Sequence, residues 1–330
     1  MDDPMKRRDA IKMLMCLALG ATRMADAQQA RKPYRIGTLT AAWAANHPAV
    51  EGLRAGLAAL GMKEGSDVVF EHLYVEGRLE ELPGAAASLI ANRVDLLFTE
   101  SENATRAAAK ATTRLPIVFA NVGDPVALGL VRKLSHPGGN ITGVSNVATD
   151  LAPKRLEMLI ALAPGIRRVW GIYAPGGGSD VLQAAQRVRK AALSFDIEFL
   201  DRPVRTPEDL RATLAAIRAG DGLLDFPTGG TTLDVSALMI EAATRAKALT
   251  MFSSAFWLEH GALAAYGTDQ RAVGYQAARL VAKILAGSRP QDVPVERANR
   301  IELVINLKVA KAIGISIPQT ALLRAERVIE

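Results

Sequence analysis

This chain of 330 residues has a single cysteine, Cys16, which lies in a short apolar segment near the N-terminus. That segment has the parts of a secretory signal peptide, so the exported chain is expected to have no cysteine and no structural disulfide. Only 5% of the residues are aromatic, and no run of five or more Lys or Arg occurs. Because basic residues form no block and no pattern interleaved with aromatics, we expect no nucleic-acid partner despite the net charge of +6.

Sequence motifs of enzymes are also missing. The chain has no G-x-S-x-G nucleophile elbow, no P-loop and no G-x-G-x-x-G fingerprint. Its four histidines are far apart, and none stands at metal-ligand spacing from a Cys, Asp or Glu: His47, His72, His136 and His260. We therefore expect no catalytic residues, no cofactor and no metal site.

The N-terminal residues 1–27 are predicted to be a signal peptide. Lys6-Arg7-Arg8 is a basic region, residues 13–21 are apolar, and Ala25-Asp26-Ala27 is a small-x-small cleavage signal. The apolar run is shorter than the roughly 20 residues that span a bilayer, so we expect contact with the membrane only through a partner protein. The paired arginines with Lys12 partly match a twin-arginine signal, which leaves Sec and twin-arginine export open. Either route predicts a periplasmic protein.

From residue 34 onward, short apolar runs typical of strands alternate with helical patterns. Thr206 and Pro207, for example, predict a helix over 207–219, with a threonine N-cap and a proline at the first position. Regular alternation predicts parallel sheets that helices cover on both faces. Two series of similar length join near residue 146, which predicts an α/β protein with two similar lobes. The strands are expected at 35–39, 68–75, 95–99, 116–122, 141–146, 168–173, 197–200, 222–226, 249–252, 263–267 and 302–307.

The passage 117–145 is the most informative part of the chain. Its residues predict a buried strand, a sharp turn with Asp124, a short helix, a Gly-rich turn and a second strand. Such a unit places Asp124 outside the carboxyl end of a strand, where open α/β sheets bind ligands. Asp124 precedes Pro125, so its role is equally consistent with a helix N-cap.

Polar and aromatic residues follow many of the expected strands. In parallel sheets these positions share one edge, so two lobes that face each other would bring them to one cleft suited to a small molecule. Asn103 and Asp269 fit equally well as helix caps, and Trp43 and Phe256 as packed hydrophobic residues. The candidate ligand-binding residues are Thr40, Trp43, Thr99, Glu100, Ser101, Asn103, Asp124, Asn146, Tyr173, Asp225, Thr228, Ser254, Phe256, Tyr266 and Asp269.

Several motifs resemble those of one bacterial transport family. They are Glu51-Gly52-Leu53-Arg54-Ala55-Gly56-Leu57 with Leu60-Gly61, Glu76-Gly77-Arg78, Asp124 with Pro137-Gly138-Gly139-Asn140, Lys154-Arg155-Leu156-Glu157, Tyr266-Gly267-Thr268-Asp269, and Glu302-Leu303-Val304-Ile305-Asn306-Leu307-Lys308. On these motifs the chain resembles the substrate-binding proteins of bacterial ABC importers, in the subgroup similar to tryptophan- and tyrosine-binding components. At one place it departs from the pattern: it reads Ala255-Phe256-Trp257 where members often carry Arg-Glu-Phe.

The resemblance implies the type I periplasmic binding protein architecture. In that fold, two Rossmann-like lobes with parallel sheets are joined by a hinge that is crossed more than once, and the ligand lies in the cleft between them. The tail returns one element to the first lobe before it ends on the second. We therefore expect residues 33–146 plus about 265–290 in the first lobe. The second lobe is expected to contain 147–264 plus about 300–330.

The resulting hypothesis is an exported solute-binding protein that captures an amino acid or an aromatic or carboxylate compound and delivers it to an ABC permease. For an amino acid, Thr99 or Ser101 with nearby N–H groups would hold the carboxylate, Asp124 would pair the ammonium, and Trp43 or Phe256 would cover the side chain. One alternative is a nucleotide- or cofactor-dependent enzyme on a doubly wound fold. Another is the sensory domain of a regulator, although no DNA-binding helix pair is visible.

Overall fold

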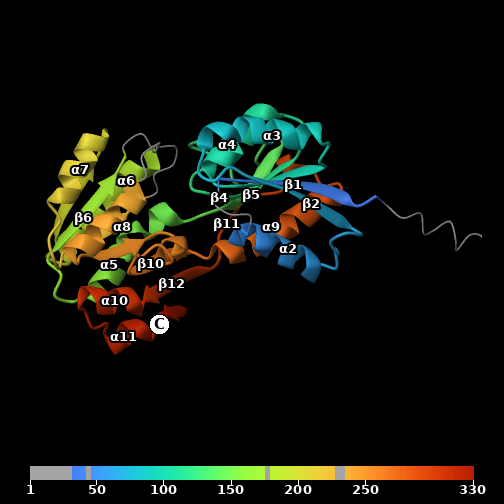
Figure 1. Cartoon of the computed structure of the whole chain (residues 1–330). Coiled ribbons are helices and arrows are strands. Elements are labelled where there is room, and N and C mark those ends of the chain that lie inside the picture. Colours follow the sequence, from blue (N-terminus) through green and yellow to red (C-terminus); the bar gives the residue numbers. More distant parts are fainter. Residues whose placement is uncertain (1–31, 42–45, 175–178, 227–234) are drawn as a thin grey trace, which may run out of the picture.

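The computed structural model describes residues 32–41, 46–174, 179–226 and 235–330. These residues form two α/β lobes, each built around one sheet (Figure 1). The predicted signal peptide, residues 1–27, lies outside the described residues, and so do the candidate site residues Trp43 and Thr228. The α/β fold class with two lobes and mostly parallel strands is confirmed.

The first lobe contains a six-stranded sheet in the order β11-β5-β4-β3-β1-β2, in which every pairing is parallel. Helices α3 (Leu82–Ala91) and α4 (Glu102–Ala111) pack on one face, and α2 (Pro48–Ala59) and α9 (Gln270–Leu285) on the other. All five residues of β3 are buried, as expected of a strand covered on both faces. The strands are β1 (Tyr34–Thr40), β2 (Val68–Tyr74), β3 (Leu96–Glu100), β4 (Ile117–Val122), β5 (Ile141–Ser145) and β11 (Glu296–Arg297).

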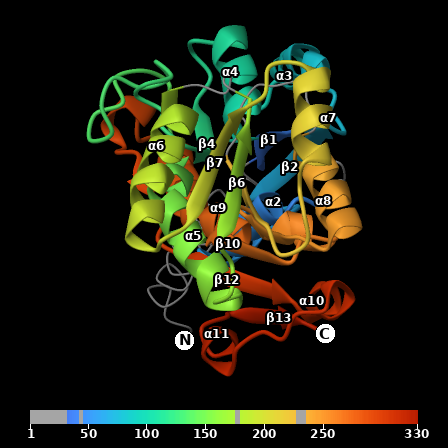
Figure 2. The same ribbon diagram turned by 90° about the vertical axis from the view of Figure 1, so that its left-hand side faces the viewer.

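The second lobe contains a seven-stranded sheet in the order β13-β12-β10-β9-β8-β6-β7, in which only β12 runs antiparallel to its neighbour β10 among the described pairings. Figure 2 views this lobe from its outer side, with α6 and α7 on opposite sides of the strands. The strands are β6 (Arg168–Tyr173), β7 (Glu198–Pro203), β8 (Gly222–Asp225), β9 (Leu249–Phe252), β10 (Ala264–Thr268), β12 (Ile301–Asn306) and β13 (Arg327–Ile329). The helices are α5 (Ala148–Leu162), α6 (Ser179–Ser194), α7 (Pro207–Ala215), α8 (Val235–Ala246), α10 (Leu307–Ile313) and α11 (Gln319–Leu322).

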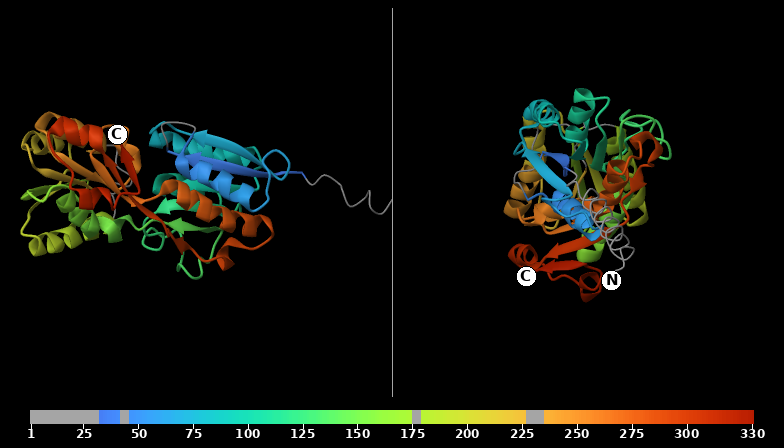
Figure 3. Two further views of the ribbon diagram at one scale, coloured as in Figure 1. Left: turned by 90° about the horizontal axis from the view of Figure 1, so that it is seen from below. Right: turned by 90° about the vertical axis from the view of Figure 1, so that its right-hand side faces the viewer.

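The chain passes between the lobes three times: from β5 to α5, from β10 to α9, and from β11 to β12. The second crossing differs from the expected boundary near residue 265. Strand β10 pairs with β9 and β12 and therefore lies in the second sheet, so the segment that returns to the first lobe begins after Thr268. It includes α9, the orange helix that packs on the first lobe in the left view of Figure 3, and also β11, which pairs with β5. Close neighbouring crossings of this kind form a hinge.

Helices α2 and α9 are distant in sequence and make the most extensive helix contact of the first lobe. Glycines permit their close approach. A Cβ atom on Gly274 would lie 1.8 Å from the backbone oxygen of Ala49, and one on Gly52 would lie 1.9 Å from the backbone oxygen of Arg271. A Cβ on Gly56 would lie 2.5 Å from that of Ala278. Because the obstructing atoms belong mainly to backbone, this contact tolerates no larger residue without separating the two helices.

A buried carboxylate ties the ends of three elements together in the second lobe. Asp221, 4% exposed, accepts two hydrogen bonds from Arg168 at 2.9 and 2.8 Å and one from the indole of Trp170 at 2.9 Å. It also accepts the backbone N–H of Arg218 at 2.9 Å. This bond holds residue 218 outside the helical ladder, and α7 ends at Ala215 instead of the expected residue 219.

We expect Asp221→Asn to lower the free energy of unfolding by about 2 kcal/mol at pH 7, since it removes charge-assisted hydrogen bonds. Burial alone would raise the pKa of Asp221, but the bonds from Arg168, Arg218 and Trp170 outweigh it and leave the pKa below its usual value. A lowered folded-state pKa stabilises the protein above the unfolded-state pKa of about 3.9, and that contribution is lost as the pH falls through the folded-state value.

Urea unfolding at several pH values checks this prediction. The gap between wild type and Asp221→Asn should be largest near neutrality and should shrink below about pH 4. The matched control is Glu208→Gln, which breaks an ion pair with Arg211 whose side chains are both 71% exposed. It should change stability by less than about 0.5 kcal/mol. A gap for Asp221→Asn that does not depend on pH would contradict the assignment.

Candidate functional site

The carboxyl ends of the parallel strands in the two sheets point toward the region between the lobes. In the first sheet, β3, β4 and β5 end at Glu100, Val122 and Ser145. In the second sheet, β6 and β8 end at Tyr173 and Asp225. Of the expected site residues, Glu100, Tyr173 and Asp225 are the last residues of their strands.

Two adjacent strand ends in the first lobe have unusual backbone conformations. Ser101, directly after β3, has φ 79° and ψ 162°, and Asn121, near the end of β4, has φ 60°. A serine in the first conformation is strained, because an L side chain there contacts its own backbone. Such strain is found mainly at functional sites. It therefore marks this edge of the sheet as the candidate binding surface of the first lobe.

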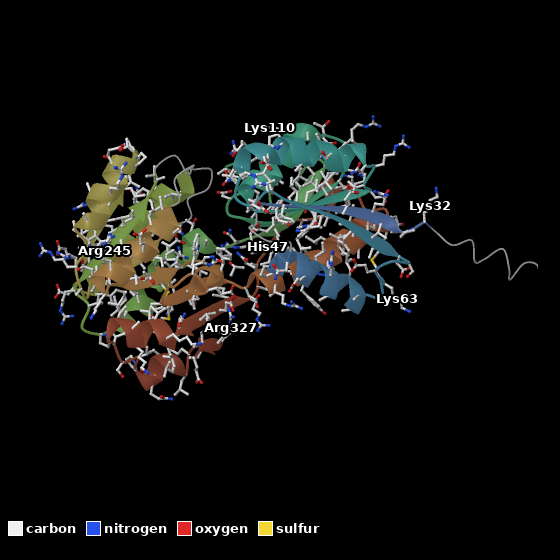
Figure 4. The ribbon with its side chains drawn as sticks, in the orientation of Figure 1. Lys32, His47, Lys63, Lys110, Arg245 and Arg327 are labelled. Atoms are coloured by element: carbon white, nitrogen blue, oxygen red, sulfur yellow. The ribbon has the colours of Figure 1, made fainter. Side chains whose placement is uncertain are left out.

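Glu100 lies between these two residues, and its side chain is 10% exposed. One carboxylate oxygen accepts a hydrogen bond from the amide of Asn121 at 3.2 Å, and the other lies 3.5 Å from Nε2 of His47. Nδ1 of His47 accepts the backbone N–H of Ala49 at 3.2 Å and so caps α2. Because Nδ1 is an acceptor, the proton of the neutral ring is on Nε2, directed toward Glu100. Figure 4 shows His47 on the side of its lobe that faces the other lobe.

The neighbouring hydroxyl groups are already occupied. Thr99 is fully buried, and its Oγ1 lies 2.9 Å from Oγ1 of Thr105. Thr40, at the end of β1, is likewise fully buried. Ser101 is the N-cap of α4 and accepts the N–H of Ala104 at 3.5 Å, and Asn103 is the second residue of that helix. Glu100, in contrast, is ionisable, largely buried and paired with no Lys or Arg of the described residues.

Asp124 begins a turn and not the expected short helix. Its Oδ1 accepts the N–H groups of Val126 and Ala127 at 3.1 and 3.0 Å. The N–H of Leu130 then donates to the carbonyl of Pro125, five residues earlier, so the α-helical ladder is not continued. Asp124 therefore caps a turn, so neither the expected helix nor a helix N-cap is present there, and its side chain is exposed.

Asn146 connects the first lobe to the hinge. Its amide donates to the carbonyl of Asn121 at 3.0 Å, and its Oδ1 accepts the N–H of Ala148 at the start of α5 at 3.1 Å. Beside it is a cavity of about 200 Å³ lined by both lobes, which we call the hinge pocket. The pocket lining includes Asp124, Asn146, Asp150, Arg187 and Arg297.

Asp150 in α5 makes ion pairs with Arg187 of α6, at 2.6 Å, and with Arg297 of β11. Burial alone would raise the pKa of Asp150, but the two arginines hold it below its usual value. Since Arg297 belongs to the first sheet and Arg187 to the second lobe, this carboxylate connects the lobes directly at the hinge.

The second lobe contributes Tyr173 and Asp225 at adjacent strand ends. Burial raises the pKa of Tyr173 to about 12, and its ring packs 5.6 Å from that of Phe226. Asp225, 6% exposed, accepts the backbone N–H and the hydroxyl of Ser253 at 3.3 and 2.7 Å. Burial also raises the pKa of Asp225.

The remaining candidates lie near the hinge side of the second lobe. Ser254 caps the short 3₁₀ turn Ala255–Leu258 and accepts a hydrogen bond from Gln270 at 3.2 Å. Phe256 is 37% exposed, and its ring centroid lies 4.5 Å from that of His260. Tyr266 packs on the second-lobe core, whereas Asp269 caps α9 and pairs with Arg300 at 3.2 Å. Asp269 therefore has the helix-capping role that the sequence also allowed.

Sequence reasoning missed four residues: Asn121 and Ser253 at strand ends, His47 at the N-cap of α2, and Arg155 within α5. His47 precedes Pro48 at a helix start, which is a detectable capping signal. Asn121 lies inside an apolar strand, and Arg155 inside a helix beside Lys154, where a charged residue normally faces water. Only the folded structure reveals their positions.

Within the part of the chain that the structure describes, no cluster of three or more His, Cys, Asp or Glu side chains could hold a metal ion. No helix of the described residues is long and apolar enough to cross a membrane.

Two lobes of this topology, joined by three crossings and with polar strand ends that face each other, define a two-lobed solute-binding protein of type I architecture. The family model for ABC transporter substrate binding proteins matches residues 43–329, and this chain belongs to that family. The predicted family and the predicted binding function are confirmed, and the family comprises solute-binding proteins, not enzymes. Proteins of this family that serve ABC importers bind small molecules outside the cytoplasm and work with a permease.

Relatives with known ligands share this architecture. The chain is 25% identical over 271 residues to the tyrosine-binding protein of Clostridioides difficile strain R20291, covering 81% of this chain and 78% of that protein. It is 25% identical to a Streptococcus pneumonia ABC domain solved in complex with L-Trp, with a TM-score of 0.75 over 90% of this chain and all of that one. A conserved domain protein from Vibrio cholerae is 28% identical, with a TM-score of 0.74 over 90% of this chain and all of that one.

Proposed function

We propose that this protein captures an aromatic amino acid in the periplasm and delivers it to the membrane subunits of an ABC importer. Two relatives that cover most of this chain are named for, or solved with, tyrosine and tryptophan. The basic, apolar and small-x-small parts of residues 1–27 support export by a cleavable signal peptide.

Glu100 is the observation that carries the amino-acid assignment. Its carboxylate is largely buried, it lies at a strained strand end that faces the other lobe, and its neighbours are the neutral amide of Asn121 and the ring of His47. A buried carboxylate that makes no ion pair with a Lys or Arg of the described residues suits an ammonium group, since charge-assisted hydrogen bonds are strongest where water is excluded. Asp124 is less suited, because one of its oxygens already accepts two backbone N–H groups.

The aromatic side chain of the ligand is assigned to Phe256, whose exposed ring lies beside those of Trp257 and His260. Ring-to-ring contacts add to the burial of apolar surface. Because the ligand would contact Glu100 on one lobe and Phe256 on the other, it would bind the closed arrangement more tightly than the open one and shift the population toward closure. The permease would then recognise the closed form.

A thermal-shift screen of the purified protein against the twenty amino acids, aromatic acids and a set of sugars tests this proposal, followed by calorimetry on every hit. L-Tyrosine, L-tryptophan or L-phenylalanine should raise the melting temperature. At 100 to 1,000 times the dissociation constant, the stabilisation should be about 2.7–4.1 kcal/mol. Stabilisation by sugars with no response to any amino acid would refute the assignment.

A further inference from the structure

Arg155 in α5 carries a positive charge in the interior of the second lobe. The residue is 1% exposed and lies between Ala152 and Leu159 on the helix face that packs into the apolar core. Both terminal nitrogens, Nη1 and Nη2, are buried and have no hydrogen-bond partner among the residues that the structure describes. A buried guanidinium without acceptors is costly, so an arginine at this position calls for an anion that the described residues do not supply.

The direction of the Arg155 side chain follows from its place in α5. Helix α5 begins at the hinge beside Asn146, and side chains in a helix lean toward its N-terminus, so Arg155 extends toward the strand ends. Asp225, at the end of β8, is close enough to raise the pKa of Arg155, although burial has the larger effect and lowers it to about 10. The lean of the side chain and the electrostatic influence of Asp225 both indicate the side of the core on which β8 ends.

Asp225 is not the missing acceptor. In the described part of the chain, no nitrogen of Arg155 lies within 4.0 Å of a carboxylate oxygen. Asp225 instead accepts hydrogen bonds from the backbone N–H and hydroxyl of Ser253 and from the hydroxyl of Ser236, at 3.3, 2.7 and 3.4 Å. Its acceptor positions are used by neutral donors, while the planar fork of Arg155 donors is unused. A second carboxylate is the group that this fork matches best.

We propose that Arg155 is the receptor for the carboxylate of the ligand, which it binds through two parallel N–H···O bonds when the lobes close. The guanidinium is covered in this structure, so it reaches the carboxylate by rotation of its flexible three-carbon stem toward the strand ends. The proposal rests on the proposed function and deepens it. The zwitterion would place its ammonium on Glu100 of the first lobe and its carboxylate on Arg155 of the second. One small molecule would then supply the missing countercharge and draw the lobes together.

The competing explanation is that Arg155 only balances the charge of Asp225 within the lobe. The two explanations predict opposite effects of Asp225→Asn. If Arg155 binds the ligand carboxylate, removal of the negative charge at Asp225 takes away a repulsion and should strengthen the binding of carboxylates about two- to tenfold. If Arg155 exists to balance Asp225, the same substitution leaves Arg155 without any partner and should destabilise the protein without a gain in affinity.

The experiment is isothermal calorimetry with matched ligand pairs that differ only in the carboxyl group. L-Tyrosine is compared with L-tyrosinamide, L-tryptophan with L-tryptophanamide, and the amine-free 3-(4-hydroxyphenyl)propionate with its amide. The wild-type protein should prefer each carboxylate by about 50-fold or more. In Arg155→Met this preference should fall below about threefold while the affinity for the amides is unchanged, and Arg155→Lys should keep part of it because the charge remains without the fork.

Unfolding curves establish that the variants are folded, and methionine has a volume suited to this apolar site. If Arg155→Met does not fold, Arg155→Lys and Asp225→Asn decide the question. Three results would overturn the proposal. They are a carboxylate preference that survives in Arg155→Met, an equal loss of affinity for acids and amides in that variant, and no carboxylate preference in the wild type. If the wild type binds amino acids but their carboxylate does not depend on Arg155, the proposed function stands and only the role of Arg155 is refuted. An Arg155-dependent preference for the amine-free acid, without amino-acid binding, would refute the amino-acid assignment alone.

Discussion

Replacing Gly274 with valine should destabilise the first lobe by about 3 kcal/mol or more, because the contact between α2 and α9 has no space for a side chain. The first added carbon would lie 1.8 Å from the carbonyl oxygen of Ala49 and 2.7 Å from its carbonyl carbon. Both atoms belong to the backbone of α2, so no rotamer change relieves the overlap. The two helices must separate, and the packing of residues such as Leu53 and Val281 is lost with them.

Urea unfolding followed by far-ultraviolet circular dichroism measures this effect. Gly84→Ala is the matched control, since Gly84 lies in α3 of the same lobe and a Cβ there would have no heavy atom within 4 Å. Alanine at that position should stabilise the protein by about 0.5–1 kcal/mol, as expected for a glycine in a helix. If the Gly274 variant were as stable as the wild type, the close approach of α2 and α9 would be wrong.

Replacing Glu100 with glutamine should weaken the binding of an aromatic amino acid at least about 100-fold, which corresponds to about 2.7 kcal/mol. The amide keeps the shape of the side chain and its contact with Asn121 but removes the charge that attracts the ammonium group. The ligand would then have to bury a cation without its countercharge, which costs far more than the loss of an exposed ion pair. Calorimetry with L-tyrosine and L-tryptophan measures the change.

Asp292→Asn is the control for this substitution, because Asp292 pairs with Arg289 on the surface of the first lobe and is 52% exposed. It should change the affinity by less than twofold. Asp124→Ala separates the two candidate carboxylates. If the ammonium binds Asp124, that variant would lose affinity while Glu100→Gln would keep it, and the assignment to Glu100 would be refuted.

Much of the architecture could be predicted from local patterns. Thr206 and Pro207 predicted the start of α7, and the Thr206 hydroxyl does accept the N–H of Asp209 at 3.1 Å. The alternation of apolar runs and helices predicted both sheets, because most of their strands are followed directly by a helix that packs on the sheet. The short helix expected after Asp124-Pro125 was wrong, because an Asp-Pro pair begins a turn as readily as a helix. Whether a helix follows depends on hydrogen bonds further along the chain.

The site was less predictable, because its chemistry depends on tertiary placement. Glu100 and Asp225 were found because strand ends converge in parallel sheets. The burial of Arg155 could not be predicted, because nothing in the sequence separates it from the adjacent Lys154. Lys154 lies on the water-facing side of the same helix and makes an ion pair with Glu157 at 2.6 Å. Only the packing of α5 against the second sheet distinguishes a surface arginine from a buried one. The strain at Ser101 likewise arises from the fold and has no local sequence signal.

The return of α9 to the first lobe has a consequence for how the protein is made. During translation, the strands and helices up to Ser145 emerge first, yet the sheet face that α9 shares with α2 stays partly uncovered until residues 270–285 have left the ribosome. The second lobe is largely synthesised in the interval. The nascent first lobe must therefore remain unfinished, with apolar surface accessible to chaperones, for most of the time that the ribosome needs to complete the chain.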